Sequence, residues 1–323
     1  VTVNSITSDD VINSTEAAGT VTVSGTATGG DIATGDRVVL VINGTTYTTS
    51  VSSAGSWSID VAGSDLAADT EFDVVVSSSN SDGITVDSVG SSSHEVDLSA
   101  SGRIVVSDIT SDDVVNAAES NANVIVSGRV TGDVKDGDIV TLTVNGNEYT
   151  GTVSARNFSI SVSGADLAND PGQTVYARVT VVDKAGNELL VEGNSSYQVD
   201  TLAEISINTV TTDDKIDDGE GDSVMLSGNT VGVDSGQVVS VSIVSSDSSV
   251  VIDGLIATVQ ADGSWSISGV DLSSFTNEMS YAVLANVTDG AGNSAIQAVR
   301  DFTINSGISA VTDSDADANT ISE

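Results

Sequence analysis

The sequence predicts an all-β chain of three tandem antiparallel β-sandwiches that together form an extended rod. Its 323 residues include 39% hydrophobic but only 3% aromatic residues, and the apolar residues are largely Val and Ile interleaved with Thr and Ser. That mixture is typical of half-buried strands. Similar segments also recur along the chain, and within each segment apolar and polar residues alternate with the period of two that a strand requires.

A repeated motif defines the expected domains. The segment ITSDDVIN at Ile6–Asn13 returns as ITSDDVVN at Ile109–Asn116 and, more weakly, as VTTDDKID at Val210–Asp217. Glycines and a Gly-x-Asp-Leu motif follow each copy in the same order, and an Asn-Gly pair follows the first two, which is the signature of a tandem array. The expected domains are residues 1–101, 102–203 and 204–308, with 309–323 opening a further unit.

Alternation within each repeat identifies the strands. In the first repeat the predicted inward positions, in chain order, are Val21 and Val23, then Val38, Leu40 and Ile42, then Trp57, Ile59 and Val61, then Phe72, Val74 and Val76. The corresponding residues of the other repeats keep this parity, and a slip by one residue would turn every side chain to the other face. The matching parity therefore supports the same strands in all three repeats.

Seven strands per repeat, separated by turn signals, indicate a sandwich of immunoglobulin-like architecture. Asn43–Gly44 and Asn145–Gly146 are the strongest hairpin signals, because Asn and Gly tolerate the positive φ of a type I′ turn. The chain has no cysteine, so these sandwiches must be held by packing alone. His94 matches Tyr197 and Phe302 on the last strand, and the recurring Trp57, Phe158 and Trp265 are expected in the core rather than on sugar-binding surfaces.

Composition excludes several classes of function. A net charge of −38 at pH 7 excludes nucleic-acid binding, which needs clustered Lys and Arg. Without cysteine and with one histidine, most metal-hydrolase and triad designs are also excluded. No apolar run is long enough to span a membrane. We expect no enzyme, since adjacent acid pairs repeated in three domains do not resemble one active site flanking a cleft.

The acidic residues are predicted to collect where consecutive domains meet, because the parity of a sandwich sends alternate loops to opposite poles. Each lower pole would face the upper loops of the next domain. The predicted metal ligands are Asp9, Asp10, Glu16 and Asp97 with Asp183 and Asn187; Asp112, Asp113, Glu119 and Asp200 with Asp289 and Asn293; and Asp213, Asp214, Glu220 and Asn305 with Asp313, Asp315 and Asp317.

Calcium is the predicted cation at these joints. Carboxylates brought together repel one another unless a cation joins them, and Ca²⁺ accepts 6–8 oxygen ligands in flexible geometry. Mg²⁺ demands stricter geometry, and Zn²⁺ prefers imidazole and thiolate ligands. The alternative is that these acids are solvated turn residues, as in acidic proteins adapted to high salt.

The repeats resemble the bacterial Ig-like repeats in the extender regions of large secreted adhesins of the RTX and biofilm-associated type. The resemblance is carried by VTDGAGN at Val287–Asn293, by DGSWSI at Asp262–Ile267 and by the VDL that follows at Val270–Leu272. Residues 311–323 look like the entry to a cadherin-like repeat. In the first domain Asn80–Gly83 replaces the Asp-x-Ala-Gly-Asn loop.

The resemblance implies an extracellular stalk on the bacterial cell surface, rigidified by Ca²⁺, whose partners are the neighbouring repeats of the same chain. It also implies that other domains of a longer parent protein bind the host or biofilm ligand. The leading hypothesis is therefore a structural spacer. The alternative is a carbohydrate- or peptide-binding module in domain 3, where the connection from Ser245–Ser249 onward to Asp253–Gly254 is expected to be longer than the Asn-Gly turns of the other domains.

Overall fold

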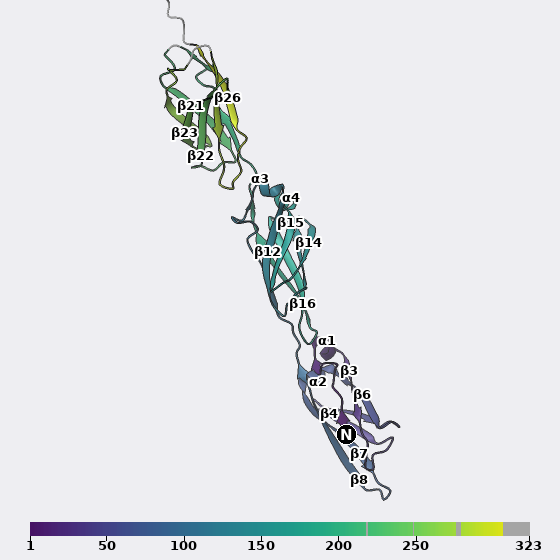
Figure 1. Cartoon of the computed structure of the whole chain (residues 1–323). Helices are drawn as coiled ribbons and strands as arrows, with labels where there is room; N and C mark the ends of the chain where they lie inside the picture. Colours follow the sequence, from purple (N-terminus) through teal and green to yellow (C-terminus); the bar gives the residue numbers. More distant parts are fainter. Residues whose placement is uncertain (218, 248, 276–278, 306–323) are drawn as a thin grey trace, which may run out of the picture. The chain divides into compact units, whose positions relative to one another are not determined.

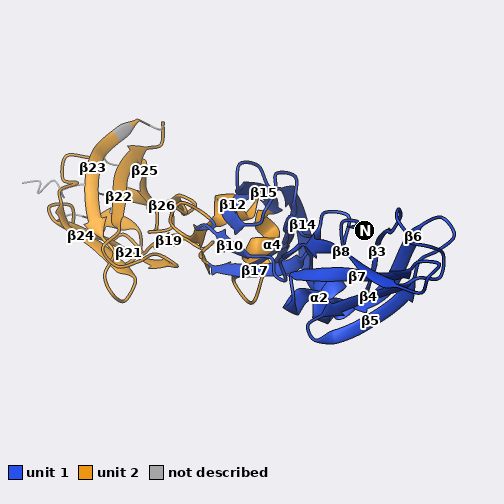
Figure 2. Ribbon diagram, turned by 90° about the horizontal axis from the view of Figure 1, so that it is seen from below, with its two compact units in different colours: residues 1–109, 125–162, 174–196 blue, residues 110–124, 163–173, 197–323 orange. Residues whose placement is uncertain are grey.

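Strands dominate the structure, as the sequence predicts. The computed structural model describes residues 1–217, 219–247, 249–275 and 279–305 (Figure 1). Its sheets are antiparallel apart from three short parallel pairs, and they form tandem immunoglobulin-like sandwiches. The chain divides into two compact units, residues 1–109, 125–162 and 174–196 in one and residues 110–124, 163–173 and 197–323 in the other (Figure 2). The three predicted domain boundaries remain a prediction.

Unit 1 contains the sandwich of the first repeat. One sheet has the order β1 (Thr2–Val3), β3 (Thr20–Thr26), β6 (Ser56–Ala62), and the other β5 (Thr45–Ser50), β4 (Arg37–Ile42), β7 (Glu71–Ser79), β8 (Thr85–Ser93). The short strand β2 (Val11–Ile12) pairs in parallel with β9 (Glu95–Val96). Two short helices that the sequence analysis did not predict, α1 (Ser14–Ala18) and α2 (Gly63–Ala68), lie between strands.

Unit 1 continues with the strands of the second repeat. One sheet has the order β10 (Gly102–Val106), β12 (Asn123–Gly132), β15 (Asn157–Ser163). The other has the order β14 (Asn147–Thr152), β13 (Ile139–Val144), β16 (Thr174–Val182), β17 (Glu188–Ser196). The two repeats therefore share one strand order, as their common parity predicts.

Unit 2 begins with β11 (Val114–Val115), which pairs in parallel with β18 (Gln198–Val199), and with the helices α3 (Ala117–Ser120) and α4 (Gly164–Asn169). It also contains the sandwich of the third repeat. One sheet has the order β19 (Glu204–Ile207), β21 (Val224–Val231), β24 (Ser264–Val270). The other has the order β20 (Lys215–Asp217), β26 (Ala298–Asn305), β25 (Ser280–Asn286), β22 (Val238–Ser245), β23 (Val250–Thr258).

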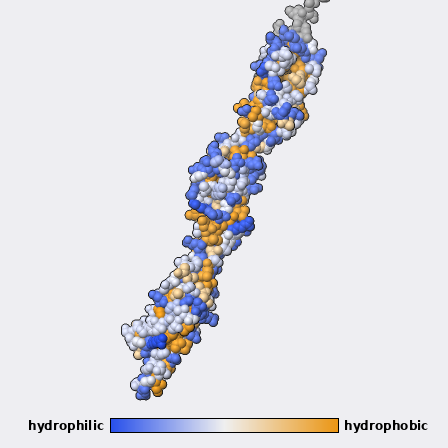
Figure 3. Space-filling view, turned by 180° about the vertical axis from the view of Figure 1, so that it is seen from behind, coloured by the Kyte–Doolittle hydropathy of each residue, from blue (hydrophilic) through white to orange (hydrophobic). Residues whose placement is uncertain are grey.

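The predicted inward residues are buried. In the first repeat all of them belong to one core cluster, and all of these predicted residues are buried except Ile59, which is half-buried. The core of the third repeat is built around Trp265, Phe302 and the buried Val and Leu residues of β21 and β22. His94 is buried at the place that Tyr197 takes in the second repeat, and each ring bonds to the carbonyl oxygen of a helix residue, Leu66 or Leu167, at 2.9 and 2.8 Å. Apolar residues also reach the surface in patches between hydrophilic ones (Figure 3).

Each core contains a glycine packed against an aromatic ring. Gly25 on β3 lies opposite Trp57 on β6, and a Cβ atom placed on Gly25 would be 2.6 Å from the indole ring. Gly228 has the same relation to Trp265, and Gly128 has it to the ring of Phe158. The aromatic ring thus fills the space above a residue that must have no side chain, which explains why glycine recurs at this position.

Hairpin geometry confirms one turn prediction and corrects the extent of another. Asn43 and Gly44, with φ of 50° and 76°, form the expected left-handed pair, as do Asn145 and Gly146. In the third repeat the connection is longer than the Asn-Gly turns, as expected, because β22 ends at Ser245 and β23 begins at Val250. It does not extend to Asp253–Gly254, which lies inside β23. The additional residues are taken up by register shifts in the β22–β23 pair, because a bulge absorbs a residue without lengthening the loop.

Gly25→Ala is expected to destabilise the first repeat by about 1–3 kcal/mol, because the methyl group would overpack the Trp57 ring and the carbonyl oxygen of Thr2. Urea unfolding followed by Trp57 fluorescence in a Trp265→Phe background measures this change. Thr20→Ala, at an exposed position of the same strand, is the control and should stay within about 0.5 kcal/mol. Equal midpoints for both variants would contradict the glycine–aromatic packing.

Candidate functional site: the repeat junctions

The chemically distinctive places in the chain are two junctions between consecutive repeats. Junction 1 consists of Asn13, Ser14, Asp97 and the loop Asp183–Asn187, all within unit 1. Junction 2 consists of Asn116, Ala117, Asp200 and the loop Asp289–Asn293, all within unit 2. Both loops carry the Asp-x-Ala-Gly-Asn pattern that the sequence analysis singled out.

A capped helix forms one side of junction 1. The Oδ1 atom of Asn13 accepts hydrogen bonds from the backbone N–H groups of Thr15 and Glu16, both at 2.9 Å, and Glu16 Oε2 accepts one from Asn13 N at 3.0 Å. This capping box fixes the start of α1. It leaves the side-chain amide N–H groups of Asn13 and the backbone N–H of Ser14 available to the next repeat.

The Asp183–Asn187 loop forms the other side. Asp183 accepts two hydrogen bonds from Asn187, one at Oδ1 from the backbone N–H at 2.8 Å and one at Oδ2 from the side-chain amide at 2.7 Å. Gly186 has a φ of 87°, which closes the loop in the left-handed region. Asp183 is 6% exposed and Asn187 is 3% exposed. The amide of Asn187 lowers the pKa of the Asp183 carboxyl below its ordinary value, because it stabilises the ionised form.

Asn187 joins the two repeats. Its Oδ1 atom accepts a hydrogen bond from Ser14 N at 2.8 Å, and its Nδ2 atom donates to the carbonyl oxygen of Asp97 at 2.8 Å. Asn13 Nδ2 donates in the opposite direction, to the carbonyl oxygen of Ala185 at 2.9 Å. We call this set of three bonds the asparagine clasp. It fixes two points of the first repeat, the start of α1 and the end of the last strand, against one loop of the second.

Junction 2 repeats the clasp. Ala117 N donates to Asn293 Oδ1 at 2.7 Å, Asn293 Nδ2 donates to the carbonyl oxygen of Asp200 at 2.9 Å, and Asn116 Nδ2 donates to the carbonyl oxygen of Ala291 at 3.2 Å. Asp289 is 5% exposed and accepts two hydrogen bonds from Asn293. The capping box is also present, between Asn116 and Glu119. The same bonds therefore recur at two places where the sequences differ.

The paired aspartates accept hydrogen bonds within their own turns and not across a junction. Asp9 Oδ1 accepts from the hydroxyl of Thr7 at 2.9 Å, Asp10 Oδ1 accepts from Ile6 N at 2.8 Å, and Asp10 has a φ of 62°. Asp112 and Asp113 repeat this arrangement in part, with Asp112 Oδ1 accepting from Thr110 at 2.9 Å and Asp113 at a φ of 60°. The hydrogen bonds of these acids stabilise the turn that precedes β2 or β11. A role in turns was the alternative to metal binding for these residues.

In the third repeat the pattern changes. Asp217 stands where Asn13 and Asn116 cap their helices, and its Oδ1 atom accepts from Asn305 Nδ2 at 3.2 Å. Glu220 Oε2 still accepts from Asp217 N, at 3.1 Å. Asp214 forms an ion pair with Arg300, which lowers the pKa of its carboxyl, and Asp213 Oδ1 accepts from Lys215 N. The predicted ligands Asp313, Asp315 and Asp317 lie outside the described residues.

The structure therefore places the predicted ligands in two groups. Asp183 and Asn187 meet the backbone carbonyl of Asp97 at junction 1, and Asp289 and Asn293 meet that of Asp200 at junction 2. Glu16 and Glu119 bond to the capping Asn of their own helix, and the Asp pairs bond within their own turns. Within the described ranges, no three His, Asp or Glu side chains come close enough together to hold a metal ion. Any cation at a junction would thus need carbonyl, amide or water oxygens as well. The ligand set stays a prediction.

Asn13, Asn116 and the loop carbonyl groups were not predicted as junction residues. The signal was present: Asn-x-x-Glu before an apolar run is a capping-box pattern, and it occurs in the first two repeats. In the predicted ligand sets the Glu of that pattern, Glu16 or Glu119, stands only as a metal ligand.

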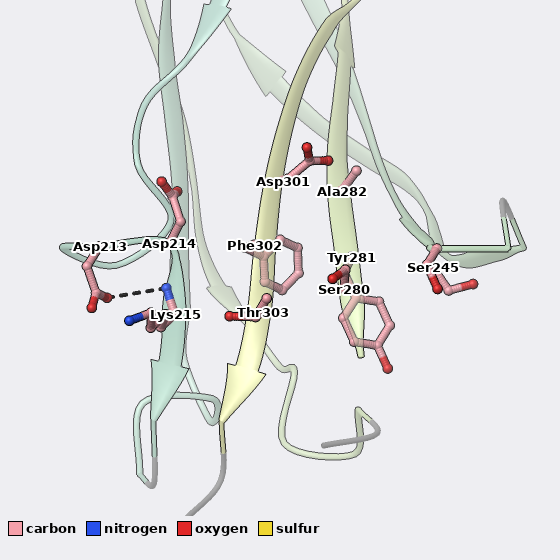
Figure 4. A pocket seen from close by; sticks show the side chains of 11 residues that line it. Asp213, Asp214, Lys215, Ser245, Ser280, Tyr281, Ala282, Asp301, Phe302 and Thr303 are labelled. Carbon is pink, nitrogen blue, oxygen red and sulfur yellow. Dashed lines mark hydrogen bonds between the residues drawn. The ribbon is translucent and has the colours of Figure 1, made fainter. Parts of the chain in front are cut away.

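A pocket of roughly 480 Å³ in the third repeat is the place to test the alternative binding function (Figure 4). It is lined by residues of β20, β25 and β26 and the end of β22. Its aromatic residues, Tyr281 and Phe302, are 5% and 2% exposed, and their rings pack against each other at 5.7 Å between centroids. Buried rings cannot stack on a sugar, so the pocket does not have the aromatic surface that a carbohydrate site uses.

Comparison with solved structures identifies the family. The chain is 47% identical to an adhesin described as Ca²⁺-stabilised, which helps an Antarctic bacterium reach out and bind ice; the match covers 94% of this chain and 73% of that one, with a TM-score of 0.67. A 1.5-MDa bacterial ice-binding adhesin, described in terms of host cell surface retention, is 37% identical over 95% of this chain and 97% of the compared chain, with a TM-score of 0.67. The chain belongs to the immunoglobulin-like repeat regions of large bacterial adhesins.

This adhesin segment matches no family model and no curated protein. Its family confirms the predicted class of structural repeat and the predicted location on the outside of a bacterial cell. The related chains are adhesin domains rather than enzymes. Among the described residues no helix has the length and apolarity needed to cross a membrane.

Asn187→Ala is expected to open junction 1 while leaving the sandwiches folded. The change removes the acceptor for Ser14 N–H and leaves buried polar groups without partners, so amide exchange at Ser14 should accelerate about tenfold or more. NMR-detected hydrogen exchange measures this rate. Ala117 N–H, the equivalent donor at junction 2, is the internal control and should be unchanged. Unchanged exchange at Ser14 would refute the clasp.

Acid is expected to loosen junction 1 through Asp183. Because the folded-state pKa of Asp183 is lowered, the stabilisation is fully present above the unfolded-state pKa of about 3.9 and is lost as the pH falls through the folded-state value. The protection factor of Ser14 N–H should therefore be flat from neutral pH to about pH 5 and fall below about pH 4. In Asp183→Asn this fall should be smaller. An identical fall in both proteins would assign it to other groups.

Proposed function

We propose that this segment is a non-catalytic spacer whose repeat junctions are stiffened by Ca²⁺. Its role is mechanical: it would set the distance and direction between other parts of a surface adhesin. The observation that carries the proposal is that one clasp, centred on a buried Asp–Asn pair, recurs at both junctions. Domains joined by polar linkers move relative to one another unless contacts between them restrict the motion. The recurrence of the same contacts at both junctions therefore indicates restricted joints.

Buried negative charge supports the cation. Asp183 and Asp289 are both more than nine-tenths buried, and the ion pairs found among the described residues, Arg178–Glu148 and Arg300–Asp214, include neither of them. An ionised carboxylate taken out of water is costly unless positive charge compensates it. The overall charge of −38 adds to the repulsion. A divalent ion held at each junction would offset both costs.

The chemistry of the junction residues fits calcium. Carboxylate, amide and carbonyl oxygens are hard ligands, and Ca²⁺ tolerates an irregular set of 6–8 of them. At junction 1 the candidates are Glu16, Asp97, Asp183 and Asn187, and at junction 2 they are Glu119, Asp200, Asp289 and Asn293. One solved relative is itself described as Ca²⁺-stabilised, which supports the same assignment for this chain.

The partners of the spacer are the preceding and following repeats of its own chain. The clasp is a contact of that kind, made through backbone groups and the amide side chains of Asn13 and Asn187. Ligands outside the cell would be bound by other domains of the parent adhesin. The alternative is a carbohydrate- or peptide-binding module in the third repeat, and the buried rings of its pocket give carbohydrate binding no specific support.

Calcium is expected to raise the melting temperature of the full chain, because a ligand bound only by the folded state stabilises it by about 2.7 kcal/mol at a concentration 100-fold above Kd. Calorimetry with Ca²⁺, with Mg²⁺ and with chelator at matched ionic strength measures the effect. Small-angle scattering of the same samples should show greater flexibility in chelator. Asp183→Asn combined with Asp289→Asn should weaken the response to Ca²⁺.

The control for general screening is NaCl at the ionic strength of the Ca²⁺ sample, which should not reproduce the shift. Equal melting and equal scattering in Ca²⁺ and chelator would refute the calcium-stiffened spacer.

A further inference from the structure

The two clasps are alike in their hydrogen bonds but differ in the charge beside them. At junction 1 the Nζ atom of Lys135 donates to the carbonyl oxygen of Asp183 at 3.3 Å, so an ammonium group lies against the Asp183–Asn187 loop. A second lysine, Lys184, follows Asp183 within that loop and is exposed. Junction 1 thus has cationic groups of its own on or against the loop that carries its buried carboxylate.

At junction 2 both lysines are replaced. Gly290 takes the place of Lys184, and Asp234 takes the place of Lys135. The second correspondence is structural: the carbonyl oxygen of Lys135 accepts from Asp138 N at 3.1 Å, and that of Asp234 accepts from Gln237 N at 3.3 Å, in the same turn. A Cβ atom on Gly290 would lie 2.8 Å from Asp234 Oδ2, which places this carboxylate against the Asp289–Asn293 loop.

We propose that the two junctions differ in how strongly they need a divalent cation: at junction 1 Lys135 supplies part of the positive charge, whereas junction 2 depends on the external cation alone. This inference rests on the proposed function. A lysine ammonium attracts the same carboxylate that Ca²⁺ would neutralise, and it is present at any calcium concentration. At junction 2 Asp234 adds negative charge where junction 1 has positive charge, so closing that joint without a cation costs more.

Two backbone amides report each junction separately. Ser14 N–H bonds to Asn187 Oδ1 and Ala117 N–H bonds to Asn293 Oδ1, and each bond forms only when its own clasp is closed. Their exchange rates can be followed in the same sample of the full chain. The comparison is therefore internal and does not require either repeat to be isolated.

The test is a calcium titration of the full chain with exchange measured at Ser14 and Ala117. In chelator Ser14 should keep most of its protection, whereas Ala117 should lose about tenfold or more. Lys135→Asp should make Ser14 calcium-dependent, and Asp234→Lys should make Ala117 calcium-independent. Lys135→Arg, which keeps the charge, and Asp253→Lys, which makes the same charge change on β23, are the matched controls and should leave both amides as in the parent protein.

The outcomes separate the two proposals. If Ca²⁺ protects both amides to the same extent and at the same concentration, and the two charge swaps have no effect, the difference between the junctions is refuted while the calcium-stiffened spacer stands. If Ca²⁺ changes neither amide, the spacer proposal fails and this inference fails with it. The inference is supported if Ca²⁺ slows exchange mainly at Ala117 in the parent protein and also slows exchange at Ser14 in Lys135→Asp.

Discussion

A buried asparagine amide is the interaction on which the junctions of this chain depend. The side chain of Asn187 has one acceptor and two donors, and all are used: the acceptor by Ser14 N–H, the donors by the carbonyl oxygen of Asp97 and by Asp183. Because a buried polar group without a partner costs free energy, an amide satisfied by two repeats at once favours one arrangement of them over others. Asn293 makes the same bonds at the second junction.

The clasp also gives a role to two of the short helices, α1 and α3, in a chain that is otherwise built mainly of strands. A helix N-terminus exposes backbone N–H groups without intrahelical partners. In α1 the capping asparagine satisfies two of them, and the next repeat satisfies the N–H of Ser14. The helix start therefore acts as a set of donors aimed at the following loop. A strand would have used those donors within its own sheet.

The two junctions share their hydrogen bonds but differ in the charged residues beside them. The clasps keep the same bonds because their geometry is fixed by backbone groups and two asparagine amides, whereas the charge beside them changes from Lys135 at junction 1 to Asp234 at junction 2. An array can in this way keep one joint structure and still adjust the cation sensitivity of each joint separately. In the third repeat the charge changes at the capping position itself, where Asp217 replaces the asparagine of the first two repeats.

The sequence by itself determined the repeats, the strand parity, the buried aromatic positions and the type I′ turns, because these follow from local periodicity and from backbone preferences of single residues. Val21, Val76 and Trp57 are buried, and Asn43–Gly44 has positive φ angles, as that reasoning predicts. Loop parity placed the Asp183–Asn187 loop opposite Asp97, but only the tertiary structure decided which atoms bond across the junction. Glu16 and Asn13 are three residues apart, so their capping box could be predicted locally, but the bond between Ser14 and Asn187 joins residues from different repeats, and no spacing in the sequence specifies that contact.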